Sequence, residues 1–140
     1  MRKIFITLMT LTMAPLAMAQ NAPQSPTVFS IDSLTAEQVV AAKDFRQKQG
    51  EVRTQEWAVL QPLFPRYHTT ETGPNQVRVV EEPSVIMTTT DLGSLLGEPT
   101  SKTTDRWTYS LGWIEGRHHM VSFGIEGNQV HPLGYRIINP

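Results

Sequence analysis

The sequence predicts a single small α+β domain over residues 34–140, with two N-terminal helices packed on a small antiparallel sheet. Three observations predict it. Apolar residues recur at helical spacing between residues 34 and 61, they alternate with polar residues in the last third of the chain, and short turns separate the alternating segments. Helices followed by hairpin-connected strands are typical of α+β proteins that contain an antiparallel meander.

Residues 1–19 have the features of a cleavable export signal. Arg2 and Lys3 form a short positive region, and residues 4–16 form an apolar stretch. Residues 17–19 (Ala-Met-Ala) then fit the small-x-small pattern that precedes a cleavage site. The apolar stretch is shorter than the roughly 20 residues of a membrane span, and the chain has no cysteine for lipid attachment. We therefore expect a periplasmic protein that is neither lipidated nor held by a transmembrane segment.

The charge balance argues against nucleic-acid binding. The chain has 12 basic and 13 acidic residues, and the loss of Arg2 and Lys3 with the signal would make the remainder more acidic. Domains that bind nucleic acid usually carry a clear excess of positive charge. The lack of cysteine also excludes disulfides, thiolate metal sites and a cysteine nucleophile.

A helix is expected after a polar, proline-containing flexible leader at residues 20–33. Thr35 is a suitable N-cap, and Gln38 three residues later would complete a capping box. Gly50 is a natural stop for this helix. Its apolar stripe consists of Val39, Ala41, Ala42 and Phe45.

A second, shorter helix is expected at residues 54–61, where Trp57 and Leu60 share one face and prolines follow. The next segment gives mixed signals. Residues 73–75 (Gly-Pro-Asn) form a turn sequence, and the valines of residues 77–80 favour a strand.

The last third of the chain predicts a short helix followed by strands. Thr90 or Asp91 is expected to cap one or two helical turns, which Gly97 ends with Pro99 just beyond. The alternating segments predict strands at residues 107–111, 121–125 and 135–138, joined by connections at residues 113–117 and 126–128.

The run of residues 89–99 (Thr-Thr-Asp-Leu-Gly-Ser-Leu-Leu-Gly-Glu-Pro), followed by residues 105–109 (Asp-Arg-Trp-Thr-Tyr), resembles the small outer-membrane assembly lipoproteins of the SmpA, OmlA and BamE type. Those proteins have a short helix that ends in Leu-Gly-x-Pro and then a strand with a Trp-x-Tyr pattern. Residues 123–128 look like their later strand and charged turn. The resemblance implies a BamE-like helix-plus-meander fold and a scaffold or binding role in the cell envelope. The family's lipid-bearing cysteine is missing, and the resemblance implies no catalytic residue.

Few residues suggest catalysis or metal binding. His118 and His119 could bind a metal with His131 or His68, but adjacent residues of a strand point to opposite faces. Glu81 and Glu82 could form a carboxylate pair for glycoside chemistry, although on a strand they too would diverge. Serine-elbow, zinc-protease and phosphate-loop motifs are missing from the sequence. We therefore expect neither an enzyme nor a resident cofactor or metal.

The aromatic residues of the C-terminal strands are the candidates for a partner-binding face. Exposed tryptophan, tyrosine and arginine side chains are typical anchors of protein interfaces. The candidates are Trp107, Tyr109, Trp113, Arg117 and Tyr135.

The expected function is that of an exported, non-enzymatic protein that binds or scaffolds another envelope protein. Two alternatives remain open. One is an inhibitor of a secreted hydrolase, which would use the same aromatic face. The other is a protein that binds a small ligand or metal through His118, His119 and Glu115.

Overall fold

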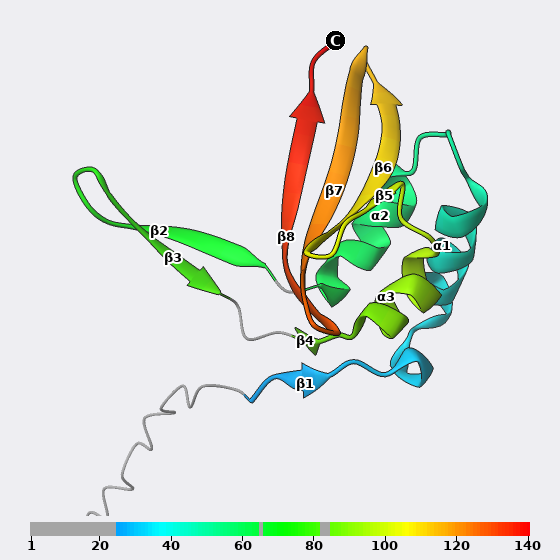
Figure 1. Cartoon of the computed structure of the whole chain (residues 1–140), viewed down its shortest axis with the longest axis horizontal. Helices are drawn as coiled ribbons and strands as arrows, with labels where there is room; N and C mark the ends of the chain where they lie inside the picture. The colour runs from blue at the N-terminus through cyan, green and yellow to red at the C-terminus, as the bar shows by residue number, and fades with distance from the viewer. Residues whose placement is uncertain (1–24, 65, 82–84) are drawn as a thin grey trace, which may run out of the picture.

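The computed structural model describes residues 25–64, 66–81 and 85–140, with the backbone alone for residues 67–72 and 76–81. The expected signal, residues 1–19, and residues 20–24 of the expected leader lie outside the described residues. The described residues form a mixed α+β structure, with three α-helices and a four-stranded antiparallel sheet in the order β5-β6-β7-β8 (Figure 1). The bounds of these strands are Ser101–Lys102 for β5, Arg106–Ile114 for β6, Arg117–Glu126 for β7 and Gln129–Ile138 for β8.

The first two helices begin and end close to where the sequence predicts. Helix α1 spans Ala36–Gln47, and Thr35 and Gln38 form the expected capping box. Helix α2 spans Thr54–Leu60 and buries Trp57 and Leu60. The 3-10 helix η2, Gln61–Leu63, follows it directly, so the proline at position 62 lies inside a helical turn. Proline fits there because its fixed φ suits the first positions of a helix.

The cap of the third helix differs from the expectation. Helix α3 spans Thr89–Leu96, and its N-cap is Thr88, not Thr90 or Asp91. The Thr88 hydroxyl accepts a hydrogen bond from the backbone N–H of Asp91, and the Asp91 carboxylate accepts one from the backbone N–H of Thr88. Aspartate therefore acts as the third helical residue of a capping box, where glutamate or glutamine is more usual. Gly97 ends the helix with φ of 79°, as expected.

The connection between β6 and β7 is shorter than the expected residues 113–117. Only Glu115 and Gly116 lie between the paired residues Ile114 and Arg117. Both connecting residues have positive φ, 49° and 75°, as in the two-residue turns that match the twist of a β-hairpin. Trp113 and Arg117 therefore lie on strands and not in a loop.

The described part of the expected leader is structured. Strand β1 (Thr27–Val28) pairs in parallel with β4 (Val85–Ile86), and the 3-10 helix η1 spans Ile31–Ser33. Phe29, which lies between β1 and η1 in the chain, is 8% exposed and belongs to the core. Sequence periodicity does not predict this pairing, because β1 and β4 are two residues long and lie far apart in the chain. Strands β2 (Tyr67–Gly73) and β3 (Gln76–Glu81) form a separate hairpin around the predicted turn.

One core joins the three helices to one face of the sheet (Figure 1). Tyr109, Leu111, Val121 and Phe123 of the sheet are fully buried. The rings of Tyr109 and Phe123 contact the helical layer. Between ring centroids, Phe45 of α1 lies 6.2 Å from Tyr109, and Trp57 of α2 lies 6.3 Å from Phe123. We call this buried face the inner face and the opposite face the outer face.

Candidate binding site at the end of the sheet

The long strands extend beyond the helices at the end of the sheet that holds the β6–β7 turn and the C-terminus (Figure 1). We call this end the sheet tip. Its residues are Trp113, Arg117, His118, His119, Tyr135, Ile137 and Ile138. Four of them are large hydrophobic side chains between 45% and 57% exposed. Clustered exposed hydrophobic residues with arginine and aromatic side chains mark interaction surfaces, because single exposed residues are common and clusters are not.

The outer face of the sheet tip is built on a stacked pair. Trp113 and His118 lie opposite each other on β6 and β7, and their rings stack with centroids 5.1 Å apart and an interplanar angle of 13°. The Ser110 hydroxyl lies 2.7 Å from Nε2 of His118 and fixes the imidazole from the other side. The stack leaves Trp113 57% exposed, so its free ring face is available to a partner.

The inner face of the sheet tip carries a second aromatic pair. His119 and Tyr135 are joined by a 2.5 Å hydrogen bond between Nδ1 and the phenol oxygen. Ile137 pairs with His119 across β7 and β8 and is 48% exposed. These side chains share a face with the buried Val121, but they lie beyond the part of the sheet that the helices cover.

The α1–α2 loop marks where the covered part of the inner face ends. The backbone N–H of Arg53 donates to the Leu111 carbonyl at 3.0 Å. A bulge follows between Ser110 and Gly112, and a Cβ at Gly112 would lie 2.8 Å from the Glu51 carbonyl oxygen. Gly112 also has φ of 96°, which favours glycine. The loop therefore needs glycine at this position to lie against the strand.

Two shallow hollows continue the outer face away from the sheet tip, with volumes of about 180 and 290 Å³. Arg106, Ser122 and Arg136 line both hollows. The hydroxyls of Thr108 and Ser122 lie 3.0 Å apart on their floor. Asp105, at the rim of the larger hollow, accepts a hydrogen bond from Thr103 that holds its pKa below the usual value. The two guanidinium groups make this part of the outer face basic and suited to acidic groups.

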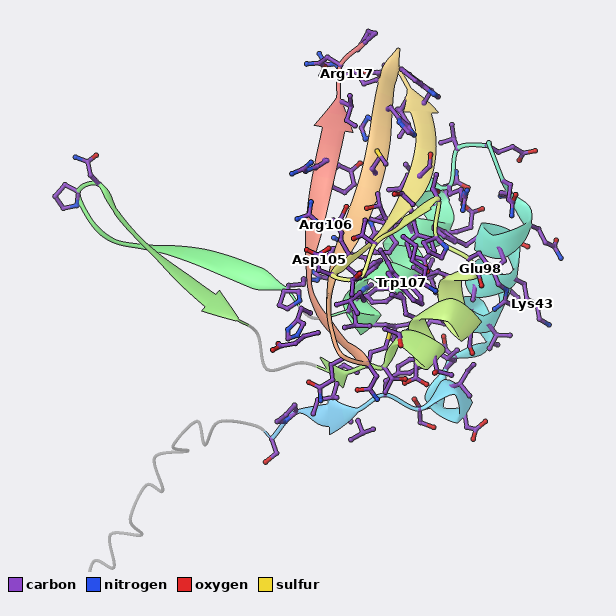
Figure 2. All side chains as sticks on the ribbon, in the orientation of Figure 1. Lys43, Glu98, Asp105, Arg106, Trp107 and Arg117 are labelled. Carbon is purple, nitrogen blue, oxygen red and sulfur yellow. The ribbon has the colours of Figure 1, made fainter. Side chains whose placement is uncertain are left out.

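Three of the five predicted interface residues lie at the sheet tip. Trp113 is on its outer face, whereas Arg117 and Tyr135 are on its inner face. Figure 2 shows Arg117 at this end of the sheet. Trp107 lies towards the opposite end, half-buried, with Nζ of Lys102 4.3 Å from its ring centroid (Figure 2).

Tyr109 differs from the expectation. Its side chain is fully buried, its hydroxyl donates to the Gly97 carbonyl at 2.9 Å, and burial raises its pKa. It is therefore a core residue and cannot belong to an exposed face. Its alternation with Leu111 indicates a shared face, but it does not say that this face is buried.

The sequence suggests a metal-binding role for His118 and His119, or ordinary surface positions, and it does not place Ile137 or Ile138 on a binding face. The histidines point to opposite faces of β7, and each contacts a different partner, Ser110 or Tyr135. Among the residues whose side chains are described, no group of three histidine, cysteine or carboxylate residues lies close enough to hold a metal. His68, Glu81 and Glu82 lie outside that set.

None of the helices in the described part of the chain is both long enough and apolar enough to cross a membrane. Comparisons of the chain with protein-family models, with curated proteins and with solved structures found no match.

Proposed function

We propose that this protein is exported to the periplasm and binds another protein of the cell envelope through the sheet tip. The observation that carries the proposal is the cluster of exposed apolar and aromatic side chains on strands that extend beyond the helices (Figure 1). The export signal predicted at residues 1–19 supports the compartment. The proposed role is binding or scaffolding, without chemistry on the partner.

The chemistry of the sheet tip supports a protein partner. Trp113 and Tyr135 offer large rigid rings that lose little conformational entropy on binding, and the neighbouring histidine of each ring holds it in place. Arg117 adds a charged donor on the inner face, two positions from His119 on β7. Among the described residues β8 is the last strand of the sheet, so the edge beside Tyr135 and Ile137 can pair with an extended segment of the partner.

We further propose that the helices and the sheet are arranged as in the BamE-like proteins. The support is the order of the short helix α3, its stop at Gly97 and the following strand with Trp107 and Tyr109. This arrangement would place the protein beside assembly factors of the outer membrane. A chain without the lipid-bearing cysteine would reach them by binding alone.

The experiment that tests this function is capture of partners from chemically cross-linked cells, followed by mass spectrometry. We expect wild type and the variant Ile31→Ser to recover the same envelope protein, and Ile137→Ser to recover much less of it. Ile31→Ser is the matched control for Ile137→Ser, since the two isoleucines are 47% and 48% exposed and lie in different parts of the molecule. Recovery of a single secreted hydrolase would instead support the inhibitor alternative. Equal recovery by both variants would contradict the proposed surface.

A further inference from the structure

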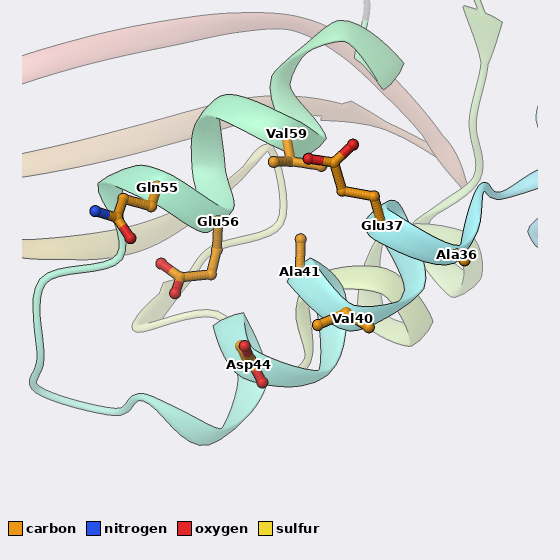
Figure 3. A pocket seen from close by; sticks show the side chains of 8 residues that line it. All are labelled: Ala36, Glu37, Val40, Ala41, Asp44, Gln55, Glu56 and Val59. Atoms are coloured by element: carbon orange, nitrogen blue, oxygen red, sulfur yellow. The ribbon is translucent and has the colours of Figure 1, made fainter.

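A groove between α1 and α2 forms a second surface, on the helical layer instead of the sheet (Figure 3). Its volume is about 420 Å³, and it is open to solvent along its length. The side chains that line it are Ala36, Glu37, Val40, Ala41, Asp44, Gln55, Glu56 and Val59. Val40 is 57% exposed, which is unusual for a large apolar residue in the middle of a helix that already buries its opposite side.

Carboxylates surround this apolar floor. Figure 3 shows Glu37 and Asp44 extending from α1 on either side of Val40 and Ala41, with Glu56 entering from α2. Glu37 and Asp44 make no salt bridge within the described part of the chain. An apolar floor with an acidic border is the complement of a segment that has both apolar and basic side chains.

Glu56 adds a third carboxylate to the wall of the groove. Its side chain is 8% exposed, and it lines the groove. Oε1 accepts a hydrogen bond from the Lys48 ammonium, and this bond holds the pKa of the carboxyl below its usual value. Oε2 is buried and has no hydrogen-bond partner among the described residues. The carboxylate therefore adds a fixed negative charge to the wall of the groove.

We propose that the α1–α2 groove binds a basic amphipathic helix of a partner protein. One lysine or arginine of that helix would pair with Asp44 at the border of the groove, and its apolar side chains would cover Val40, Ala41 and Val59. A helix fits better than a small molecule because small-molecule sites usually enclose most of their ligand, whereas this groove is open. A helix laid along α1 and α2 would bury the whole apolar strip.

The test uses the purified protein and synthetic peptides of about 18 residues, a length at which an amphipathic sequence can form a helix. The first peptide contains leucine and lysine at amphipathic helical spacing. The second has glutamate in place of lysine, and the third has the composition of the first in scrambled order. We expect binding of the first peptide alone, weakened by salt because the charges are exposed to solvent. Amide NMR shifts should be confined to α1 and α2.

The variants Asp44→Lys and Val40→Lys should each weaken binding of the leucine–lysine peptide by about tenfold or more. Asp32→Lys and Val52→Lys are matched controls that should bind normally, since these residues are exposed but do not line the groove. All four positions are at least partly exposed, so the variants should fold. Equal binding of the acidic or scrambled peptide, or normal binding by Asp44→Lys and Val40→Lys, would overturn the proposal. A concentration-dependent dimer that Val40→Lys dissociates would also overturn it, because a second copy would then cover the groove.

Discussion

The hydroxyl of Tyr109 donates a hydrogen bond to the carbonyl of Gly97 over 2.9 Å, and this bond ties the end of α3 to the middle of the sheet. The two residues belong to the two motifs on which the family resemblance was based, the helix stop and the Trp-x-Tyr strand. The bond gives both motifs a structural role, since the last carbonyls of a helix need partners and a buried phenol needs an acceptor.

Tyr109→Phe should lower the free energy of unfolding by about 1 kcal/mol, the usual value of a hydrogen bond between neutral groups. Its effect should also depend on pH. Burial raises the pKa of Tyr109 in the folded state, so the folded protein retains the phenol proton more tightly than the unfolded chain. The resulting stabilisation is fully present below the ordinary tyrosine pKa of 10.0 and is lost as the pH rises above it.

Chemical denaturation at pH values from 8 to about 11, on both sides of the ordinary tyrosine pKa, measures this loss of stability. Wild type and the control Tyr135→Phe should both lose stability above pH 10, since Tyr135 is 47% exposed. Tyr109→Phe should lose less over the same range. Parallel profiles for the two variants would show that the buried phenol does not cause the alkaline loss.

Gly97→Val should destabilise the protein by about 2 kcal/mol, because a β-branched residue resists positive φ. The valine Cβ would also approach Cγ of Arg46 to 3.1 Å. Arg46 donates to the Ser94 carbonyl at the end of α3, so the same substitution would disturb a second contact of this helix terminus. Thermal unfolding followed by circular dichroism measures the loss, and an unchanged midpoint would show that Gly97 does not need its left-handed conformation.

Gly112→Ala should destabilise the protein by more than 2 kcal/mol, since an unfavourable φ and a clash with the Glu51 carbonyl act together. Gly50→Ala is the matched control. Gly50 has φ of 81°, but nothing lies within 4 Å of its Cβ position, so its substitution should cost only about 1 kcal/mol. Urea denaturation of both variants separates the two causes. Equal losses would mean that the α1–α2 loop does not lie against β6 at Gly112.

Glu56→Gln should make the protein less sensitive to acid. The Lys48 hydrogen bond lowers the pKa of Glu56 from its ordinary value of 4.5, so the stabilisation is present above that pH and is lost as the pH falls. Glu56→Gln and Lys48→Met should both be less stable than wild type near neutral pH and should lose less stability on acidification. Unfolding midpoints measured from pH 7 to about 3 test this expectation. A wild-type acid profile in either variant would contradict the pairing.

Periodicity and capping chemistry predicted the elements that local sequence determines. The Thr35 capping box, the buried Trp57 and Leu60, and the Gly97 stop are all set by residues within a few positions of one another. Thr88 was missed as a cap because Asp91 was assigned to that role and not to the third helical position. The β1–β4 pairing depends on contacts between distant segments, which periodicity does not reveal.

The candidate site could be predicted only in part for a similar reason. Trp113, Arg117 and Tyr135 are recognisable as interface residue types, but their gathering depends on the register of three strands. The two-residue turn at Glu115 and Gly116 and the bulge before Gly112 set that register. Because a shift of one residue reverses the faces of a strand, alternation alone could not separate the buried Tyr109 from the exposed Trp113.

Site-specific photo-cross-linking in living cells shows whether the sheet tip contacts an envelope protein. A photoreactive residue would replace Trp113, Arg117 or Tyr135 in turn, with Asn128 as the control position. Asn128 is exposed and lies in the β7–β8 turn, at the other end of the sheet. We expect one common cross-linked envelope protein from the three sheet-tip positions and none of it from position 128. Cross-links of equal yield from position 128, or none from the three sheet-tip positions, would show that the sheet tip is not the contact surface.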